Sequence, residues 1–177
     1  MIKILLIGLQ RIDKIELAKQ LTSKNDDLSI ASIFTTNVEY KDTEINENFI
    51  YYMDTLTVNL SFKNNSFLYI NTIDYVSHGI TIDDYYNNDI ICMSIEEFNS
   101  ISPKTFEHDE LLIIWIDEKG KVSNNELTEV KYFQDELSKY NYMYFLNEDM
   151  NDISDIILDY LSCNDEQHRN ELLNENN

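Results

Sequence analysis

The sequence predicts an α/β protein of three layers, in which helices cover both faces of a mainly parallel five-stranded sheet that carries a small β-rich insertion. Short apolar runs bounded by polar turns recur along the chain, as expected for strands that are buried on both faces. Segments with helical spacing alternate with these runs over most of the length, and this alternation is typical of a parallel sheet with crossover helices. The 177 residues are enough for one domain with a sizeable core.

The strands of the predicted sheet are apolar runs that end in polar or turn-forming residues. The predicted core strands are residues 2–7, 28–34, 89–93, 111–116 and 142–146. The stretch from Phe49 to Tyr86 is instead rich in aromatic residues and locally alternating. This pattern predicts the β-rich insertion, at about residues 45–87.

Helical periodicity marks the connections between the predicted strands. The predicted helices are residues 13–24, about 55–64, 95–101, 125–140 and 150–162. Residues 1–163 therefore form the predicted domain. The polar segment 164–177 is charged, and we expect it to be a weakly helical tail that frays.

The chain is strongly acidic, with 33 acidic against 13 basic residues and a formal net charge of -20. Direct binding to nucleic acid requires clustered Lys and Arg, which the sequence lacks, so we expect none. An acidic surface aids solubility. No apolar run approaches the roughly 20 residues of a membrane helix, and residues 1–30 lack a signal-peptide pattern. We therefore expect a cytoplasmic protein that does not bind membranes.

Cysteine and histidine residues give no metal-binding pattern. Cys92 and Cys163 lack ligand spacing and fit a reducing compartment. His78, His108 and His168 are far apart in the sequence and have no paired cysteine or carboxylate at ligand spacing. These residues therefore predict no metal site.

The acidic pair Asp83-Asp84 allows two interpretations. Its carboxylates could hold Mg²⁺. The segment Thr81-Ile-Asp-Asp is also the pattern of a helix N-cap followed by an acidic first turn. We favour helix capping, because acidic residues are enriched in the first turn of helices.

A sequence with part of a phosphate-binding loop follows the first predicted strand. Gly8 and Lys14 stand where the pattern G-x-x-x-x-G-K-[ST] has its first glycine and its lysine, with Arg11 between them. Asp13 replaces the second glycine and places a negative charge where phosphate oxygens would lie. Ile15 replaces the hydroxyl that would bind Mg²⁺. Both replacements oppose nucleotide binding.

These residues and the order of the segments make residues 1–162 resemble the guanylate kinase family of P-loop nucleoside monophosphate kinases. The run ending at Thr36 is similar to the family strand that ends in Thr-Thr-Arg, and Asn37 stands where the arginine would grip the monophosphate. Tyr51 and Tyr52 resemble the tyrosine of the family's insertion that contacts the same phosphate.

Further positions of the resemblance lie downstream. The segment from Tyr75 to Gly79 resembles the family's Tyr-Gly-[Thr/Ser] turn before a helix, and Tyr69 stands where the family has its guanine-reading glutamate. The strand before the last helix is also similar, and the resemblance implies that Asn147 lies on the adenine side of the ATP site. The lid position, residues 117–136, contains lysines and no arginine, whereas the family's lid arginines clamp the transferring phosphoryl group.

We interpret the chain as a degenerate guanylate kinase-like protein that has lost phosphoryl transfer, uses no cofactor and acts by binding another protein, as scaffold members of the family do. Asp13, Ile15, Asn37 and Tyr69 are the replacements on which this interpretation depends, together with the lid. The tyrosine-rich insertion is the predicted contact surface. Its acidic neighbours favour a basic partner surface.

Two alternatives stay open from the sequence. The first is a divergent active (deoxy)nucleoside monophosphate kinase that uses ATP and Mg²⁺, with Lys14 and the lid lysines replacing the usual residues. The second is an acidic inhibitor that imitates nucleic acid and blocks a basic groove on another protein. The bias toward Asn, Ile and Tyr is typical of an AT-rich coding genome and fits a phage or other viral protein, located in the host cytoplasm or the virion.

Overall fold

A computed structural model of the chain describes residues 2–8, 14–41, 49–117, 137, 139–146 and 149–176. Within these residues the core is a four-stranded parallel sheet in the order β6-β1-β7-β8. Its strands are β1 (Ile2–Gly8), β6 (Ile90–Ser94), β7 (Glu110–Asp117) and β8 (Asn141–Leu146). β1 lies inside the sheet and ends at Gly8, which confirms the prediction for the first strand.

The parallel sheet is covered on both faces, because successive residues of its strands point to opposite sides. Ile4 and Leu6 pack under α1 (Lys14–Lys24), α6 (Met150–Ser162) and α7 (Glu166–Glu175). Leu5 and Ile7 pack in a second cluster on the opposite face. That face is covered by α3 (Ile82–Asn87), α4 (Ile95–Ser100) and the 3-10 helix η2 (Pro103–Phe106).

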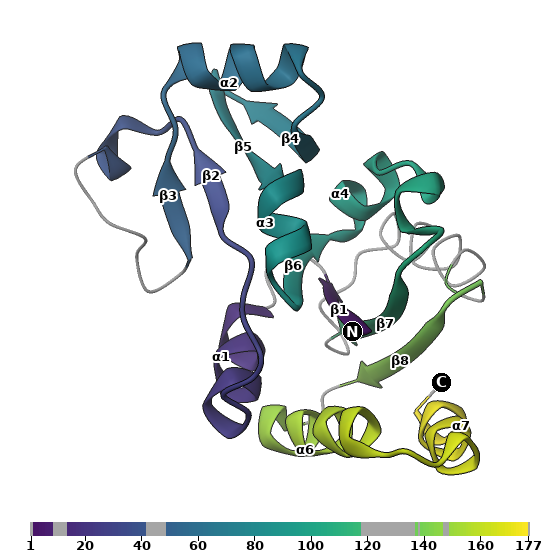
Figure 1. The fold of residues 1–177 in the computed structure, drawn as a ribbon. Helices are drawn as coiled ribbons and strands as arrows, with labels where there is room; N and C mark the ends of the chain where they lie inside the picture. Colours follow the sequence, from purple (N-terminus) through teal and green to yellow (C-terminus); the bar gives the residue numbers. More distant parts are fainter. Residues whose placement is uncertain are drawn as a thin grey trace, which may run out of the picture.

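A separate mixed sheet of four strands follows α1 in the chain and stands above the parallel sheet in Figure 1. Its order is β3-β2-β5-β4, with β2 (Ile33–Thr35) parallel to β3 (Ile50–Tyr52). β5 (Val76–Thr81) is antiparallel to both β2 and β4 (Phe67–Ile73). The sheet is accompanied by the 3-10 helix η1 (Val38–Tyr40) and by α2 (Thr55–Lys63) at the far end of the molecule. The predicted β-rich insertion is thus present.

The prediction of five strands in one parallel sheet is wrong, because residues 28–34 serve both sheets. Only Ile30 pairs with the parallel sheet, through an isolated bridge to Ile90. Ser29 is fastened to Asp89, whose Oδ2 accepts hydrogen bonds from the Ser29 N–H at 2.9 Å and from its hydroxyl at 2.7 Å. The chain then leaves this edge, and Ile33–Thr35 becomes β2 of the mixed sheet. The apolar run is therefore divided between two sheets.

The helix starts follow local capping chemistry. Asp54 caps α2, and Thr81 caps α3 with its Oγ1 accepting a hydrogen bond from the Asp84 N–H at 3.0 Å. The preference for capping at Thr81-Ile-Asp-Asp is therefore confirmed. Ser94 and Glu97 form a capping box at the start of α4.

The end of α3 is held by the first strand. Buried Lys3 of β1 donates hydrogen bonds from Nζ to the carbonyls of Tyr85 at 2.9 Å and Tyr86 at 3.0 Å. These carbonyls lie at the C-terminal end of the helix, where a positive charge is favourable. The Tyr85 hydroxyl in turn donates to Asp109 at 2.6 Å.

The C-terminal segment differs from the expected fraying tail. Residues 166–175 form α7, whose Leu173 is buried in the cluster under the parallel sheet. The Asn176 carbonyl accepts a hydrogen bond from the Tyr144 N–H on β8. Two leucines in an otherwise polar segment are thus enough to dock it. The helix predicted at residues 125–140 falls almost entirely outside the described residues.

No helix in the described part of the chain combines the length and apolar character needed to cross a membrane.

Candidate functional site between the two sheets

The candidate site lies at the carboxyl edge of the parallel sheet, where α/β proteins place their ligands. Gly8 at the end of β1 is in register with Ser94 at the end of β6. Lys14 begins α1, and Ile15 packs against the apolar cluster that includes α1 and α6. Arg11 and Asp13 lie outside the described residues. The structure therefore describes both ends of the predicted phosphate loop.

A row of four polar side chains crosses the mixed sheet and faces this edge. The strand register pairs Tyr52 with Thr35, Thr35 with His78, and His78 with Asn71. Cross-strand neighbours project from the same face of a sheet. His78 contacts Glu97 at the start of α4, so this face is turned toward the end of β6. Among these residues, the sequence-based site included only Tyr52.

Glu97 is the centre of the contacts between the mixed sheet and the parallel sheet. Its Oε1 lies 3.4 Å from His78 Nε2, and its Oε2 accepts a hydrogen bond from the Ser94 N–H at 2.7 Å. Burial alone would raise the pKa of Glu97, but the hydrogen bonds from His78 and Ser94 hold it below its ordinary value. Glu97 is thus an ionised carboxylate whose two oxygens both have partners.

Tyr69 completes this cluster from the neighbouring strand β4. It is buried, and burial together with the negative charge and hydrogen bond of Glu97 raises the pKa of its hydroxyl well above the ordinary value. The hydroxyl therefore stays protonated and bound to Glu97. Tyr69 occupies the position predicted for a base-reading residue, and here it fastens the mixed sheet to α4.

Gly79 lies in the middle of β5, where the backbone of β4 passes very close. A Cβ atom at this position would lie 2.2 Å from the carbonyl oxygen of Tyr69 and 3.0 Å from Cε1 of Phe34. The absence of a side chain is therefore required by packing. The segment Tyr75 to Gly79 thus forms a turn and a strand, and α3 follows only after Thr81.

Tyr51 points to a different cluster, at the start of α3. Its hydroxyl donates to Asp84 Oδ2 at 3.0 Å, and the Thr81 hydroxyl donates to the same oxygen at 2.6 Å. Burial, followed by the charge of Asp84, raises the pKa of Tyr51. Asp84 is therefore engaged in helix capping and in holding β3.

Thr36 and Asn37 are used within the local backbone. The Thr36 hydroxyl accepts a hydrogen bond from the Ser77 N–H at 2.8 Å. Asn37 caps η1, with its side-chain oxygen accepting from the Glu39 N–H at 3.1 Å. Asn147 and lid residues 118–136 lie outside the described residues, so their predicted roles are untested.

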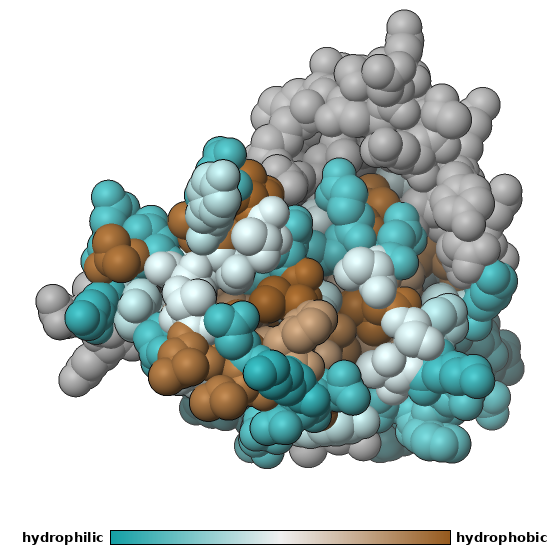
Figure 2. Space-filling view, turned by 90° about the horizontal axis from the view of Figure 1, so that it is seen from above, coloured by the Kyte–Doolittle hydropathy of each residue, from teal (hydrophilic) through white to brown (hydrophobic). Residues whose placement is uncertain are grey.

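Tyr75 is the most exposed of the predicted site residues that the structure describes. It lies fully exposed in the β4–β5 turn, with Asp74 and Tyr75 both at positive φ, 49° and 67°. A turn of two such residues matches the twist of an antiparallel hairpin. Other exposed apolar side chains belong to α2 and β4. Figure 1 shows these two elements at this end of the molecule, and Figure 2 shows apolar residues among polar ones on the same side. We call Leu56, Leu60, Phe62, Ile73 and Tyr75 the distal apolar surface.

The sequence alone did not predict the contact between His78 and Glu97. The spacing Ser94-x-x-Glu97 does signal a capping box, and it could have located the start of α4. The contact between positions 78 and 97 depends on how the mixed sheet meets the parallel sheet. In the part of the chain that the structure describes, no three His, Cys, Asp or Glu side chains gather in a way that could hold a metal ion.

The comparison with solved structures agrees with this architecture. No family model matches the sequence, and no curated protein matches it either. The structure is similar to the crystal structure of guanylate kinase from Anaplasma phagocytophilum, with a TM-score of 0.51 and 15% sequence identity. The similarity covers 90% of this chain and 84% of that one. At this identity the likeness concerns the fold alone, and the chain therefore has a guanylate kinase-like fold.

Proposed function

We propose that this protein is a guanylate kinase-like protein that does not transfer phosphoryl groups and that binds a protein partner through the distal apolar surface. The observation that supports this proposal is where the polar and the large apolar side chains of the mixed sheet and α2 lie. Tyr69 and His78, on the face turned toward the parallel sheet, are both bonded to Glu97. The large apolar side chains of the distal apolar surface are instead exposed.

The partner would offer a basic surface around an apolar pocket. Residues 49–87 carry Asp54, Asp74, Asp83 and Asp84 against Lys63 as the single Lys or Arg. Added to the net charge of -20, this composition attracts basic surfaces and repels acidic ones. An exposed aromatic ring supplies contact area at low cost in conformational entropy, and aromatic residues are enriched among interface hot spots. Tyr75 would be the central anchor.

Replacing Tyr75 or exposed Phe62 with alanine is expected to weaken the partner complex by more than about 1 kcal/mol. The fold should be intact in Tyr75→Ala, since that side chain is fully exposed. The partner would first be captured from the native host and identified by mass spectrometry, and its dissociation constant would then be measured by calorimetry with each variant. Tyr86→Ala, which removes an exposed ring on α3, is the matched control and should bind as the parent does. If both variants bind like the parent, the surface lies elsewhere, with α6 as the next candidate.

ATP with Mg²⁺ is expected not to bind at cellular concentrations. Asp13 would repel the phosphates, and Ile15 is an apolar, partly buried side chain that packs against the core cluster. Isothermal titration should therefore give no dissociation constant below about 100 μM, which corresponds to roughly 5.5 kcal/mol. The double reversion Asp13→Gly with Ile15→Ser should raise phosphate affinity. Phosphoryl transfer from ATP to GMP or a deoxynucleoside monophosphate by the parent chain would instead establish the active-kinase alternative.

A further inference from the structure

A polar cavity of about 420 Å³ lies at the amino edge of the parallel sheet, at the opposite end from Gly8. It is lined by the first residues of two strands, Glu110 of β7 and Asn141 of β8, and by side chains of α6, α7 and their connection. Its volume lies in the range of small-molecule sites, about 300–1,000 Å³. This cavity belongs neither to the phosphate loop nor to the distal apolar surface.

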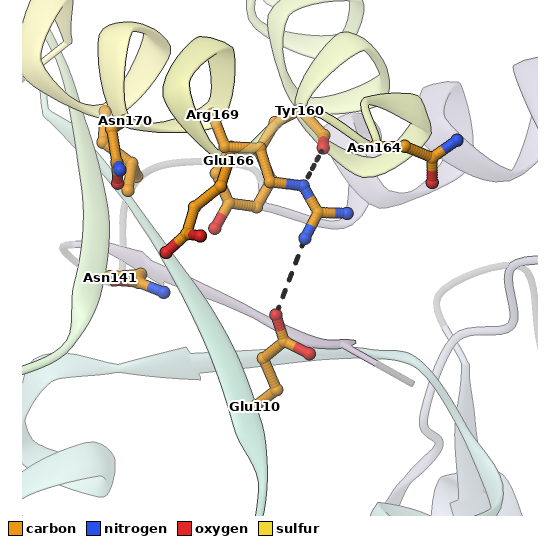
Figure 3. A pocket seen from close by; sticks show the side chains of 8 residues that line it. Glu110, Asn141, Tyr160, Asn164, Glu166, Arg169 and Asn170 are labelled. Carbon is orange, nitrogen blue, oxygen red and sulfur yellow. Dashed lines mark hydrogen bonds and ion pairs between the residues drawn. The ribbon is translucent and has the colours of Figure 1, made fainter.

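Arg169 is held in a fixed position at this cavity (Figure 3). Its Nε donates a hydrogen bond to the Tyr160 carbonyl at 3.2 Å, and its guanidinium lies 5.3 Å from the centre of the Tyr160 ring. Tyr160 itself is buried, with 3% of its surface exposed. An arginine fixed by stacking and by its Nε presents its terminal N–H groups in a defined direction. The cation is therefore preorganised, although its side chain is 27% exposed.

Two carboxylates line the same cavity. Figure 3 shows Glu166 and Glu110 on different sides of the Arg169 guanidinium, with Asn141 nearby. The distance from Arg169 Nη1 to Glu110 Oε1 is 3.8 Å, which is too long for a hydrogen bond. The Arg169 guanidinium and the Glu110 carboxylate make no hydrogen bond to each other. Each can therefore form a hydrogen bond to a ligand that enters the cavity.

The charges decide which ligand fits. A simple anion would be repelled by two carboxylates and by a chain of net charge -20. A simple cation would be repelled by the guanidinium of Arg169. A molecule that carries both charges avoids both conflicts, because its carboxylate can lie on the guanidinium and its ammonium between the glutamates. We propose that this cavity binds a small zwitterion of the free α-amino acid class, with Arg169 holding the carboxylate and Glu110 and Glu166 holding the ammonium.

The test begins with the unchanged protein. Each of the common free α-amino acids would be added at about 10 mM, where millimolar sites are occupied, to ¹⁵N-labelled protein, and amide shifts would be recorded. We expect at least one to shift resonances of residues 110, 141 and 160–173. Its carboxamide, which lacks the anion, and its N-acetyl derivative, which lacks the cation, should each bind at least about tenfold more weakly, since a tenfold change is about 1.4 kcal/mol and charged hydrogen bonds are worth that much.

Variants test the assigned roles. Glu166→Gln and Arg169→Lys should weaken binding of the best amino acid about tenfold. Glu171→Gln, on the same helix but outside the cavity lining, should leave it unchanged. The proposal is overturned if no amino acid shifts these resonances, or if the carboxamide or the N-acetyl derivative binds as well as the parent compound. It is also overturned if Glu166→Gln and Arg169→Lys, shown to be folded by their spectra, bind like the control.

Discussion

Replacement of Gly79 by alanine is expected to destabilise the protein by about 3 kcal/mol, at the upper end of the usual cost of adding a methyl group to packed structure. The new Cβ would lie 2.2 Å from the Tyr69 carbonyl oxygen, which is backbone and cannot rotate away. The strands β4 and β5 would have to separate, and their hydrogen bonds would lengthen. The loss in unfolding free energy is measured by equilibrium unfolding in urea, from the midpoint and slope of the transition.

A control for this prediction is available on the neighbouring strand. Thr72→Ala removes an exposed hydroxyl that lies 2.9 Å from the Ser77 hydroxyl. It should cost at most about 1 kcal/mol, as expected for one exposed hydrogen bond. A Gly79→Ala variant as stable as the Thr72→Ala control would contradict the close approach of β4 to β5.

Replacement of Glu97 by glutamine is expected to cost about 2 kcal/mol at neutral pH, because several hydrogen bonds to a partly buried charge are weakened together. The pKa of Glu97 is held below its ordinary value of 4.5. Its contribution to stability is therefore fully present above about pH 4.5 and is lost as the pH falls through the lowered pKa of the folded state. The parent and the variant should converge in unfolding free energy at acidic pH.

The measurement is a series of urea titrations from neutral to acidic pH. Glu96→Gln is the matched control, since Glu96 is exposed in the same helical turn and takes no part in the capping box. It should follow the parent over the whole series. A constant difference between the parent and Glu97→Gln at every pH would show that the charge of Glu97 contributes nothing.

Local sequence signals predicted the parallel sheet well. The run from Ile2 to Ile7 is apolar at consecutive positions because both faces of β1 are buried, and such a run is recognisable without any partner. The Thr81 cap was equally visible, since helix capping depends on residues within one turn. These features are decided by neighbours in the sequence.

The remaining features depend on distant residues. The run 28–34 reads as one strand, and only its attachment to Asp89 shows that the chain changes sheets after Ile30. The tyrosine-rich insertion was predicted as the contact surface, whereas one of its tyrosines, Tyr69, is buried against Glu97, which lies far along the chain. The segment of α7 looked too polar to pack, and the burial of Leu173 depends on a surface formed by other elements.

The hydrogen bonds between Ser29 and Asp89 have a mechanical consequence for the mixed sheet. The chain enters that sheet just after Ser29 and returns to the parallel sheet at Asp89, so entry and exit are joined at one point by two side-chain hydrogen bonds. An inserted unit whose ends meet can rotate as one piece about their junction. The His78–Glu97 contact then acts as a second fastening, away from the junction. Releasing Glu97 from both His78 and Tyr69 would remove this polar fastening, and the mixed sheet would then be held by the junction and by the packing of Leu68 and Ile80 in the shared apolar cluster.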